Sequence, residues 1–258
     1  MILTLNKEEM IMYKNMVLNK IDEFLNKEGF NLIKKGDKTA QKLNYIKEHN
    51  EIIFTIEFLS NIYDNNHFWG FSFTDRIPLI ENIVTNILYM NKIINVTPED
   101  ISYTIHFEND DKYSLPTEGI LINSEEAVIK VFDLFHNFYY KHFLPFFEKW
   151  KDLNVLYEYI KDKTEEELWD ILGQFAPMKK AVILKLCNDS NYQGFMDSYF
   201  QKQKEYFDED PEDIDNIRYY NASKELKQVL DNTKPITMCK WLQNKCLKNI
   251  NEVNNIFV

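Results

Sequence analysis

The chain has 258 residues, of which 45% are hydrophobic and 15% aromatic, so it can bury a sizeable core and intrinsic disorder is excluded. Its formal net charge is -11 and its only arginines are Arg76 and Arg218, which argues against binding to nucleic acid through phosphate contacts. Six glycines and seven prolines are spread along the chain without forming a linker, so one compact body is expected.

Residues 6–28 read as an amphipathic helix, because apolar side chains recur at three- and four-residue steps and Gly29 follows. Four short segments of strand character come next, in which apolar and polar residues alternate. They are residues 30–34, 42–47, 52–59 and 68–73. A period of two with one polar face is typical of an antiparallel sheet.

A second helix is predicted from Pro78 to Ile93, followed by a strand at 101–107, a turn at 108–111 and a short strand at 120–122. Ser124 is a plausible N-cap for a long helix that runs to Leu144. Most of that helix is apolar, so we expect it to be buried on most sides, between the sheet and the later helices. Pro145 is expected to kink or end it.

The rest of the chain has helical patterns throughout, with a capping box at Thr164 and Glu167. The expected helices are 153–161, 165–172, 178–188, 192–207, 211–230 and 237–249. The predicted fold class is therefore α+β, with an N-terminal helix and an antiparallel sheet followed by an all-helical half packed on them. By this division, residues 1–122 form the sheet region and residues 123–258 the helical region.

The N-terminal residues, the absence of a long apolar segment and the cysteines favour the cytoplasm. The N-terminus lacks the apolar stretch of a signal peptide, and no segment approaches the roughly 18 apolar residues of a membrane span. Cys187, Cys239 and Cys246 stand at no metal or redox spacing, as reduced thiols would. We expect a soluble protein without a membrane partner.

No catalytic, cofactor-binding or metal-ligating residues are predicted, because the nucleophile-elbow, phosphate-loop, dinucleotide and zinc-protease motifs are all missing. A run of seven acids without a base spans residues 205–215, but it lacks the central glycine of a calcium loop. We interpret it as a solvated loop that caps the next helix. Within it, Asp208, Glu209 and Asp210 are candidates for contact with a basic protein.

His136 and His142 point about 120° apart on a helix and cannot bind one metal ion together. A hydrogen-bonded histidine in the core is the main interpretation of His142. The alternative is a pocket between the sheet and helix 124–144, with Glu57, Tyr139 and His142 as its polar groups.

The negative charge is concentrated between Glu48 and Leu134, which hold fifteen acids and four bases, whereas the rest of the chain has 26 of each and is neutral. Such a field favours a basic partner, if there is a partner at all.

Several features in order resemble small bacterial α+β proteins of unknown function, some of which stand beside polymorphic toxins as immunity proteins. They are a first helix that ends at Glu28-Gly29-Phe30, a lysine-containing hairpin, the strands at 52–59 and 68–73, and the Ser124-Glu125-Glu126 helix that leads to Leu144-Pro145-Phe146-Phe147-Glu148. The resemblance covers residues 10–162 and supplies no catalytic residues. The helical tail from Thr164 departs from the short form of that pattern.

Together these observations predict a bacterial, non-enzymatic protein that acts through a protein–protein contact, of the immunity or inhibitor type. In this hypothesis its acidic sheet region neutralises a basic toxin or effector. Two alternatives stay open. One is an enzyme of unrecognised family that uses the pocket beside helix 124–144, and the other is a structural subunit of a larger assembly.

Overall fold

The computed structural model describes residues 7–35, 42–60, 67–95, 103–105 and 119–236. The chain divides into two compact units. The first comprises Met1–Asn82 and Thr97–Ala176, and the second comprises Ile83–Val96 and Pro177–Val258. The division at residues 122 and 123 made from the sequence instead separates the chain by its content of strands and helices.

In the first unit, helix α1 (Lys7–Lys27) confirms the predicted first helix. Its buried stripe consists of Val17, Ile21 and Leu25, which recur every four residues and so share one face. The helix ends before Gly29, whose φ of 86° is a conformation that glycine adopts without a steric cost.

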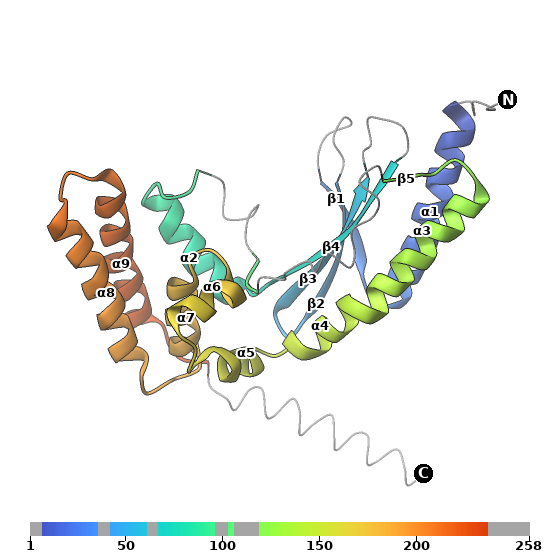
Figure 1. The fold of residues 1–258 in the computed structure, drawn as a ribbon. Helices are drawn as coiled ribbons and strands as arrows, with labels where there is room; N and C mark the ends of the chain where they lie inside the picture. The colour runs from blue at the N-terminus through green and yellow to red at the C-terminus, as the bar shows by residue number, and fades with distance from the viewer. Residues whose placement is uncertain (1–6, 36–41, 61–66, 96–102, 106–118, 237–258) are drawn as a thin grey trace, which may run out of the picture. The chain divides into compact units, whose positions relative to one another are not determined.

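The sheet is an antiparallel meander in which each strand pairs with the next (Figure 1). Its strands are β1 (Asn31–Lys35), β2 (Lys42–His49), β3 (Ile52–Ser60), β4 (His67–Arg76) and β5 (Ile120–Leu121). Tyr45, Ile56 and Phe73 stand opposite one another in adjacent strands and are all buried. The predicted antiparallel sheet with one apolar face is confirmed.

The strand expected at 101–107 falls largely outside the described residues, as does the turn at 108–111. Residues 103–105 are described and form a bend rather than a strand. Seven of the fifteen acids counted between Glu48 and Leu134 also lie outside the described residues.

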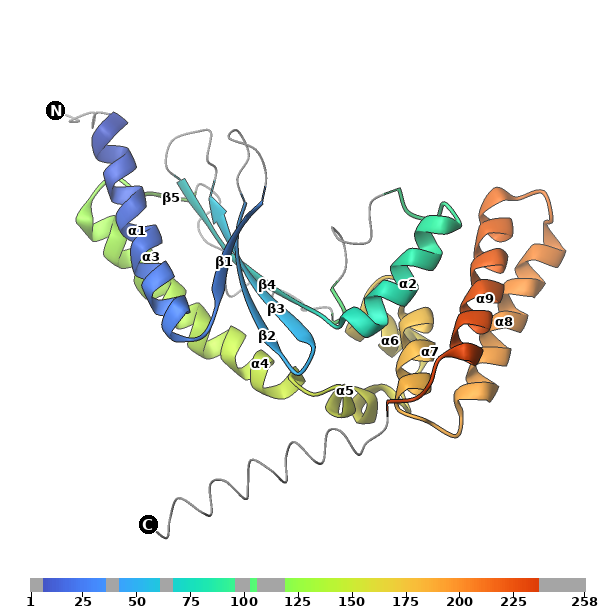
Figure 2. The same cartoon turned by 180° about the vertical axis from the view of Figure 1, so that it is seen from behind.

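One long helical run covers the apolar face of the sheet beside α1 (Figures 1 and 2). It consists of α3 (Glu125–Phe138), the π-helical turn η2 (Tyr139–Phe143) and α4 (Leu144–Trp150). The predicted N-cap is confirmed, since the Ser124 hydroxyl accepts a hydrogen bond of 3.2 Å from the Ala127 amide.

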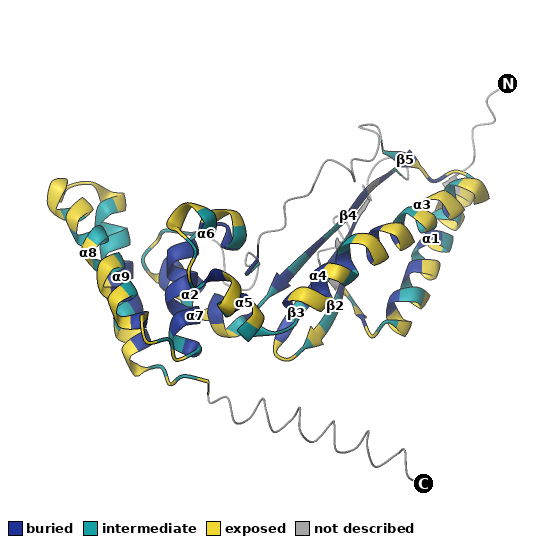
Figure 3. Ribbon diagram, turned by 60° about the horizontal axis from the view of Figure 1, so that its bottom comes forward, coloured by how far each residue is buried: buried dark blue, intermediate teal, exposed yellow. Residues whose placement is uncertain are grey.

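The expectation that this helix is buried on most sides is wrong. Only the stripe Val128, Val131, Phe135 and Phe138 of α3 is buried, at the three- and four-residue steps of a single helix face. The opposite side of α3 is exposed (Figure 3). The exposed residues are Glu125, Glu126, Ile129, Lys130, Asp133, His136 and Asn137.

The run does not end at Pro145 but continues to Trp150. Just before the proline, the Leu144 amide bonds to the Tyr139 carbonyl, five residues back, which is the hydrogen bond of a π-turn. A proline inside a helix lacks an amide donor and crowds the carbonyl four residues earlier, and a wider turn relieves that crowding. The π-turn therefore accounts for the passage of the helix through Pro145.

Aromatic rings fill the space between the sheet and this helical run, and Phe143 is fully buried among them. Its ring centroid lies 5.4 Å from that of Phe30, 5.6 Å from Phe73 and 5.3 Å from Tyr139. Phe146 and Phe147 are also buried, so they belong to the core.

The predicted helices of the C-terminal half are confirmed up to residue 232. The first unit contains α5 (Leu153–Ile160) and α6 (Glu165–Leu172). The second unit contains α8 (Tyr192–Glu209) and α9 (Ile214–Asn232). It also contains most of α2 (Pro78–Met90) and all of α7 (Ala176–Leu186) except its first residue. The helix expected at 237–249 lies outside the described residues. In the second unit, the Asn91 side chain donates a hydrogen bond of 2.7 Å to Glu225 and ties the segment after α2 to α9.

Helix α6 begins with the capping box expected from its sequence. The Thr164 hydroxyl accepts a hydrogen bond from the Glu167 amide, and the Glu167 carboxylate accepts one from the Thr164 amide. Helix α7 differs in being buried almost all round, from Ala176 to Leu184, and is the most enclosed helix of the described residues (Figure 3).

Candidate functional site

The three residues proposed for a pocket beside helix 124–144 do not come together. Tyr139 is fully buried, and its hydroxyl donates a hydrogen bond of 3.0 Å to the carboxylate of Glu28. Burial raises the pKa of Tyr139 above its ordinary value, and the hydrogen bond to Glu28 raises it further. Tyr139 therefore links η2 to the residue that follows α1.

Glu57 lies on the other face of the sheet. Residues 54, 56 and 58 of β3 are buried beneath the helices, so the alternation of a strand turns Glu57 the opposite way. Its carboxylate accepts a hydrogen bond of 3.4 Å from the Ser72 hydroxyl in the neighbouring strand. Glu57 and Tyr139 cannot act on one ligand across the packed sheet.

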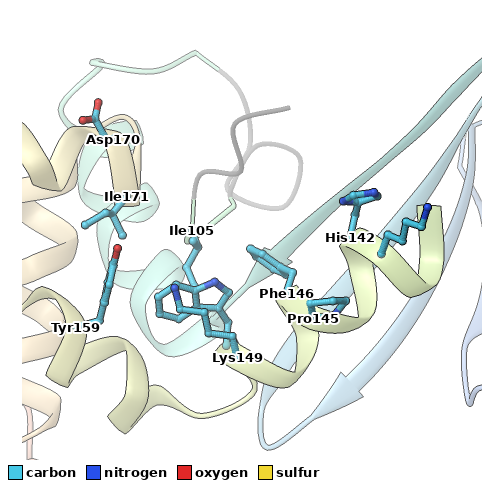
Figure 4. Close-up of a pocket in the computed structure, with 10 residues that line it drawn as sticks. Ile105, His142, Pro145, Phe146, Lys149, Tyr159, Asp170 and Ile171 are labelled. Carbon is cyan, nitrogen blue, oxygen red and sulfur yellow. The ribbon is translucent and has the colours of Figure 1, made fainter. Parts of the chain in front are cut away.

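His142 is the one residue of the three that lines a cavity. It is half-buried in η2, rather than wholly within the core as first interpreted. The cavity has a volume of about 540 Å³ and lies within the first unit (Figure 4). Figure 4 shows His142 and Phe146 on one side of it and Tyr159 and Asp170 on the other.

The walls of the cavity come from four places in the chain. The helical run supplies Lys141, His142, Pro145, Phe146, Lys149 and Trp150, whereas Tyr159 comes from α5 and Asp170 and Ile171 from α6. Ile105 completes the wall from the bend at 103–105. The site is therefore formed by tertiary packing and not by a local motif.

The end of β4 fixes the position of Ile105. The Ile105 amide donates a hydrogen bond of 3.0 Å to the Asp75 carboxylate, and the Thr104 amide donates one of 3.0 Å to the Asp75 carbonyl. In return, the Thr104 hydroxyl accepts a hydrogen bond of 2.8 Å from the Ile77 amide. Asp75 and Thr104 are fully buried, so the three bonds are shielded from water.

Tyr103 in the same bend requires a glycine at the end of α6. A Cβ atom added to Gly173 would lie 2.9 Å from the Tyr103 ring, closer than such atoms approach in real structures. Gly173 also has a backbone φ of 64°, a value that residues other than glycine rarely adopt. The bend and the end of α6 are thus packed directly against each other.

The Lys149 ammonium is held between two aromatic rings of the cavity. Its nitrogen lies 4.1 Å from the centroid of Trp150 and 4.5 Å from that of Tyr159. The two rings meet edge to face at 5.2 Å. Contact with the negative faces of the rings orients the lysine side chain and leaves its charge available, since Lys149 remains exposed.

The acidic run, in the second unit, covers the end of α8, the turn after it and the start of α9. Asp208 and Glu209 end α8, Asp210 follows, and all residues from 208 to 215 are exposed. Asp213 is the N-cap of α9, and its carboxylate accepts hydrogen bonds of 2.7 Å from the Asp215 amide and 3.0 Å from the Asn216 amide. The interpretation of the run as a capping loop is confirmed.

Two large hydrophobic side chains are exposed among these acids. Tyr206 is 45% exposed near the end of α8, and Ile214 is 55% exposed at the start of α9. We name residues 205–215 the acidic turn. Lys204 pairs with Asp208 and Arg218 with Asp215, so part of its charge is neutralised from the flanking helices.

Among the described residues, no group of three histidine, cysteine or acidic side chains is arranged to hold a metal ion. In the same part of the chain, no helix combines the length and the apolar character needed to cross a membrane.

Sequence reasoning missed most of the cavity. Lys141, Pro145 and Lys149 recur every four residues, a spacing that places them on one helix face and that could have suggested a shared site. Tyr159 and Asp170 carry no such signal, because separate helices bring them to the cavity.

Comparison with protein-family models, with curated proteins and with solved structures gives no match.

Proposed function

We propose that the protein is a non-enzymatic interaction protein, of the immunity or inhibitor type, and that the acidic turn binds a basic surface of its partner. The observation that carries the proposal is the exposure of Tyr206 and Ile214 within a stretch of seven acids and no base. Protein interfaces typically have aromatic or aliphatic anchors at the centre and charged groups at the rim.

The turn is well suited to present these groups. It joins two antiparallel helices of 18 and 19 residues, and the Asp213 cap and the Asn216 side chain hold its backbone in place. The Asn216 amide donates hydrogen bonds of 3.0 Å to the Tyr206 carbonyl and 3.3 Å to the Asp210 carbonyl. A fixed turn loses little conformational freedom when a partner binds.

Charge also supports a basic partner. A locally acidic surface speeds association with a positively charged protein and makes the affinity decrease as salt is added.

The experiment is affinity capture of the tagged full-length protein from a lysate of its host, at low and at high salt, followed by mass spectrometry. The decisive comparison uses a double variant of the turn, Glu209→Gln with Glu212→Gln, against a matched control on α3, Glu126→Gln with Asp133→Asn. Both pairs remove two exposed negative charges. We expect the turn variant to weaken binding of a basic partner about tenfold and the control to leave it unchanged.

Two results would refute the proposal. One is a partner held equally well by the wild-type protein and the turn variant. The other is a partner whose binding does not change with salt. An Ile214→Ser variant extends the test, because loss of a central apolar anchor is expected to weaken the same complex by a factor of about ten or more.

A further inference from the structure

We propose that the cavity of the first unit binds a small molecule that carries a flat apolar ring and one anionic group. This site is separate from the acidic turn, so either proposal can fail without the other. Its volume of about 540 Å³ lies within the range of about 300–1,000 Å³ that is typical of small-molecule sites.

The charges around the cavity select an anion. Lys141 and Lys149 line it from a single helical run, against one acid, Asp170. The imidazole of His142 lies on the same run and adds a polar group. Lysines therefore outnumber acids around the cavity, although the whole chain has a net charge of -11. An anionic group on a ligand would be attracted to the side of the cavity formed by the helical run.

The aromatic side chains of the cavity favour a ligand that contains a flat ring. Phe146 and Trp150 are almost fully buried and form an apolar wall, and Tyr159 is 43% exposed beside them. A flat ring can pack against these surfaces by stacking or edge contacts, which aromatic pairs favour beyond simple burial of area. In Figure 4, the Tyr159 side chain extends toward Ile171.

Two features prepare the site before a ligand arrives. Lys149 is already oriented by the Trp150 and Tyr159 rings, so less side-chain entropy is lost when it meets an anion. His142 lies in a π-turn, a rare distortion of a helix that is found frequently at functional sites.

The test uses the full-length chain labelled with ¹⁵N, and it follows the indole N–H resonance of Trp150, assigned from its loss in Trp150→Phe. The probes are naphthalene-2-carboxylate and 2-naphthyl phosphate, which place two different anionic groups on one ring. The comparators are 2-naphthylmethylamine, with the opposite charge, and inorganic phosphate, with no ring. We expect both aromatic anions to shift the resonance to saturation, with dissociation constants about tenfold or more below those of the comparators.

The variants Lys149→Gln and Lys141→Gln are each expected to raise these dissociation constants about three- to tenfold. Lys130→Gln, an exposed lysine of α3 away from the cavity, serves as the matched control and should leave them unchanged. Lys149 packs between rings, so its variant is also checked by thermal unfolding. Lys141→Gln keeps the test decisive if the Lys149 variant is unstable.

The preference between carboxylate and phosphate then identifies the anionic group of the natural ligand. Either preference supports the site. Absence of a saturable shift at millimolar concentration would overturn the proposal, as would binding of 2-naphthylmethylamine as tight as that of the anions. Affinities unchanged in both lysine variants would overturn it as well.

Discussion

The hydroxyl of Tyr139 donates its hydrogen bond to the carboxylate of Glu28, a residue 111 positions earlier in the chain. The bond joins the turn that follows α1 to the π-turn that carries His142. Lys47 bonds to the carbonyl of the same Glu28 at 2.8 Å, so the end of α1, the sheet and the helical run meet at one residue.

Replacement of Tyr139 by phenylalanine removes this hydrogen bond and keeps the ring. Because the acceptor is charged and the site is partly buried, we expect the free energy of unfolding to fall by about 1–2 kcal/mol. Urea unfolding measures the change, with Tyr140→Phe as the exposed neighbouring control. Equal stability of the two variants would show that the bond contributes nothing.

Stability should also decrease in alkali because of buried tyrosines. Burial raises the pKa of Tyr45 and of Tyr139 above the ordinary value of 10.0, and nearby carboxylates add to the effect. In the unfolded chain these tyrosines ionise near pH 10, whereas in the folded protein they stay protonated to a higher pH. The free energy of unfolding is therefore unaffected below pH 10 and falls as the pH rises from 10 toward the pKa of the folded state. Urea midpoints at pH 7 and pH 11 should therefore differ less in Tyr45→Phe and Tyr139→Phe than in the wild type.

The contribution of the α6 capping box to stability should depend on pH in the acid range. The Lys163 ammonium, and after it the Thr164 amide, lower the pKa of Glu167 from 4.5 to about 2. Since this pKa is depressed, its contribution to stability is complete above pH 4.5 and is lost as the pH falls through about 2. Lys163→Gln should move the NMR titration of the Glu167 carboxyl toward 4.5, whereas Lys161→Gln, which removes the partner of Glu158, should not.

The aromatic core should be most sensitive at Phe143. Its ring is fully buried between the sheet and the helical run, so Phe143→Ala leaves a large cavity and should cost about 3–5 kcal/mol. Phe132 of α3 is only half-buried, and the same change there should cost distinctly less. Chemical denaturation of both variants decides the order, and the reverse order would contradict the packing described for the core.

Replacement of two neighbouring acids of the acidic turn should change the stability of the protein by different amounts. Asp213→Ala removes the N-cap of α9 and should lower stability by about 1 kcal/mol. Glu212→Ala changes an exposed side chain and should have an effect within about 0.5 kcal/mol. Thermal unfolding separates the two, and it also shows which acids of the turn can be changed in binding experiments without loss of the fold.

The sequence predicted most helices and strands of the described residues because their signals are local. Alternating residues in β3 and β4 specified one apolar face, and Ser124 and Thr164 marked two helix starts. These signals depend on neighbours within four residues, and tertiary packing did not override them.

The errors came from side chains whose burial depends on distant parts of the chain. Ile129 of α3 is apolar by type yet 56% exposed, so the helix appeared more enclosed than it is. In the same way, Tyr139 and His142 are three residues apart, yet one is committed to Glu28 and the other lines the cavity. Neither outcome follows from spacing, because each is decided by what α1 and α6 bring to the site.

The second unit is made of two pieces of chain separated by the segment 97–176. During synthesis, α2 emerges with its apolar residues Val84, Ile87 and Leu88, and the ribosome must add roughly 90 residues before α7 begins and more before α9 is complete. At about 5–20 residues per second, that delay is on the order of 5–20 s. During that interval the apolar residues of α2 lack the later helices of their own unit, and exposed apolar surface of this kind promotes aggregation. A fragment that stops at Ala176 would lack those helices permanently.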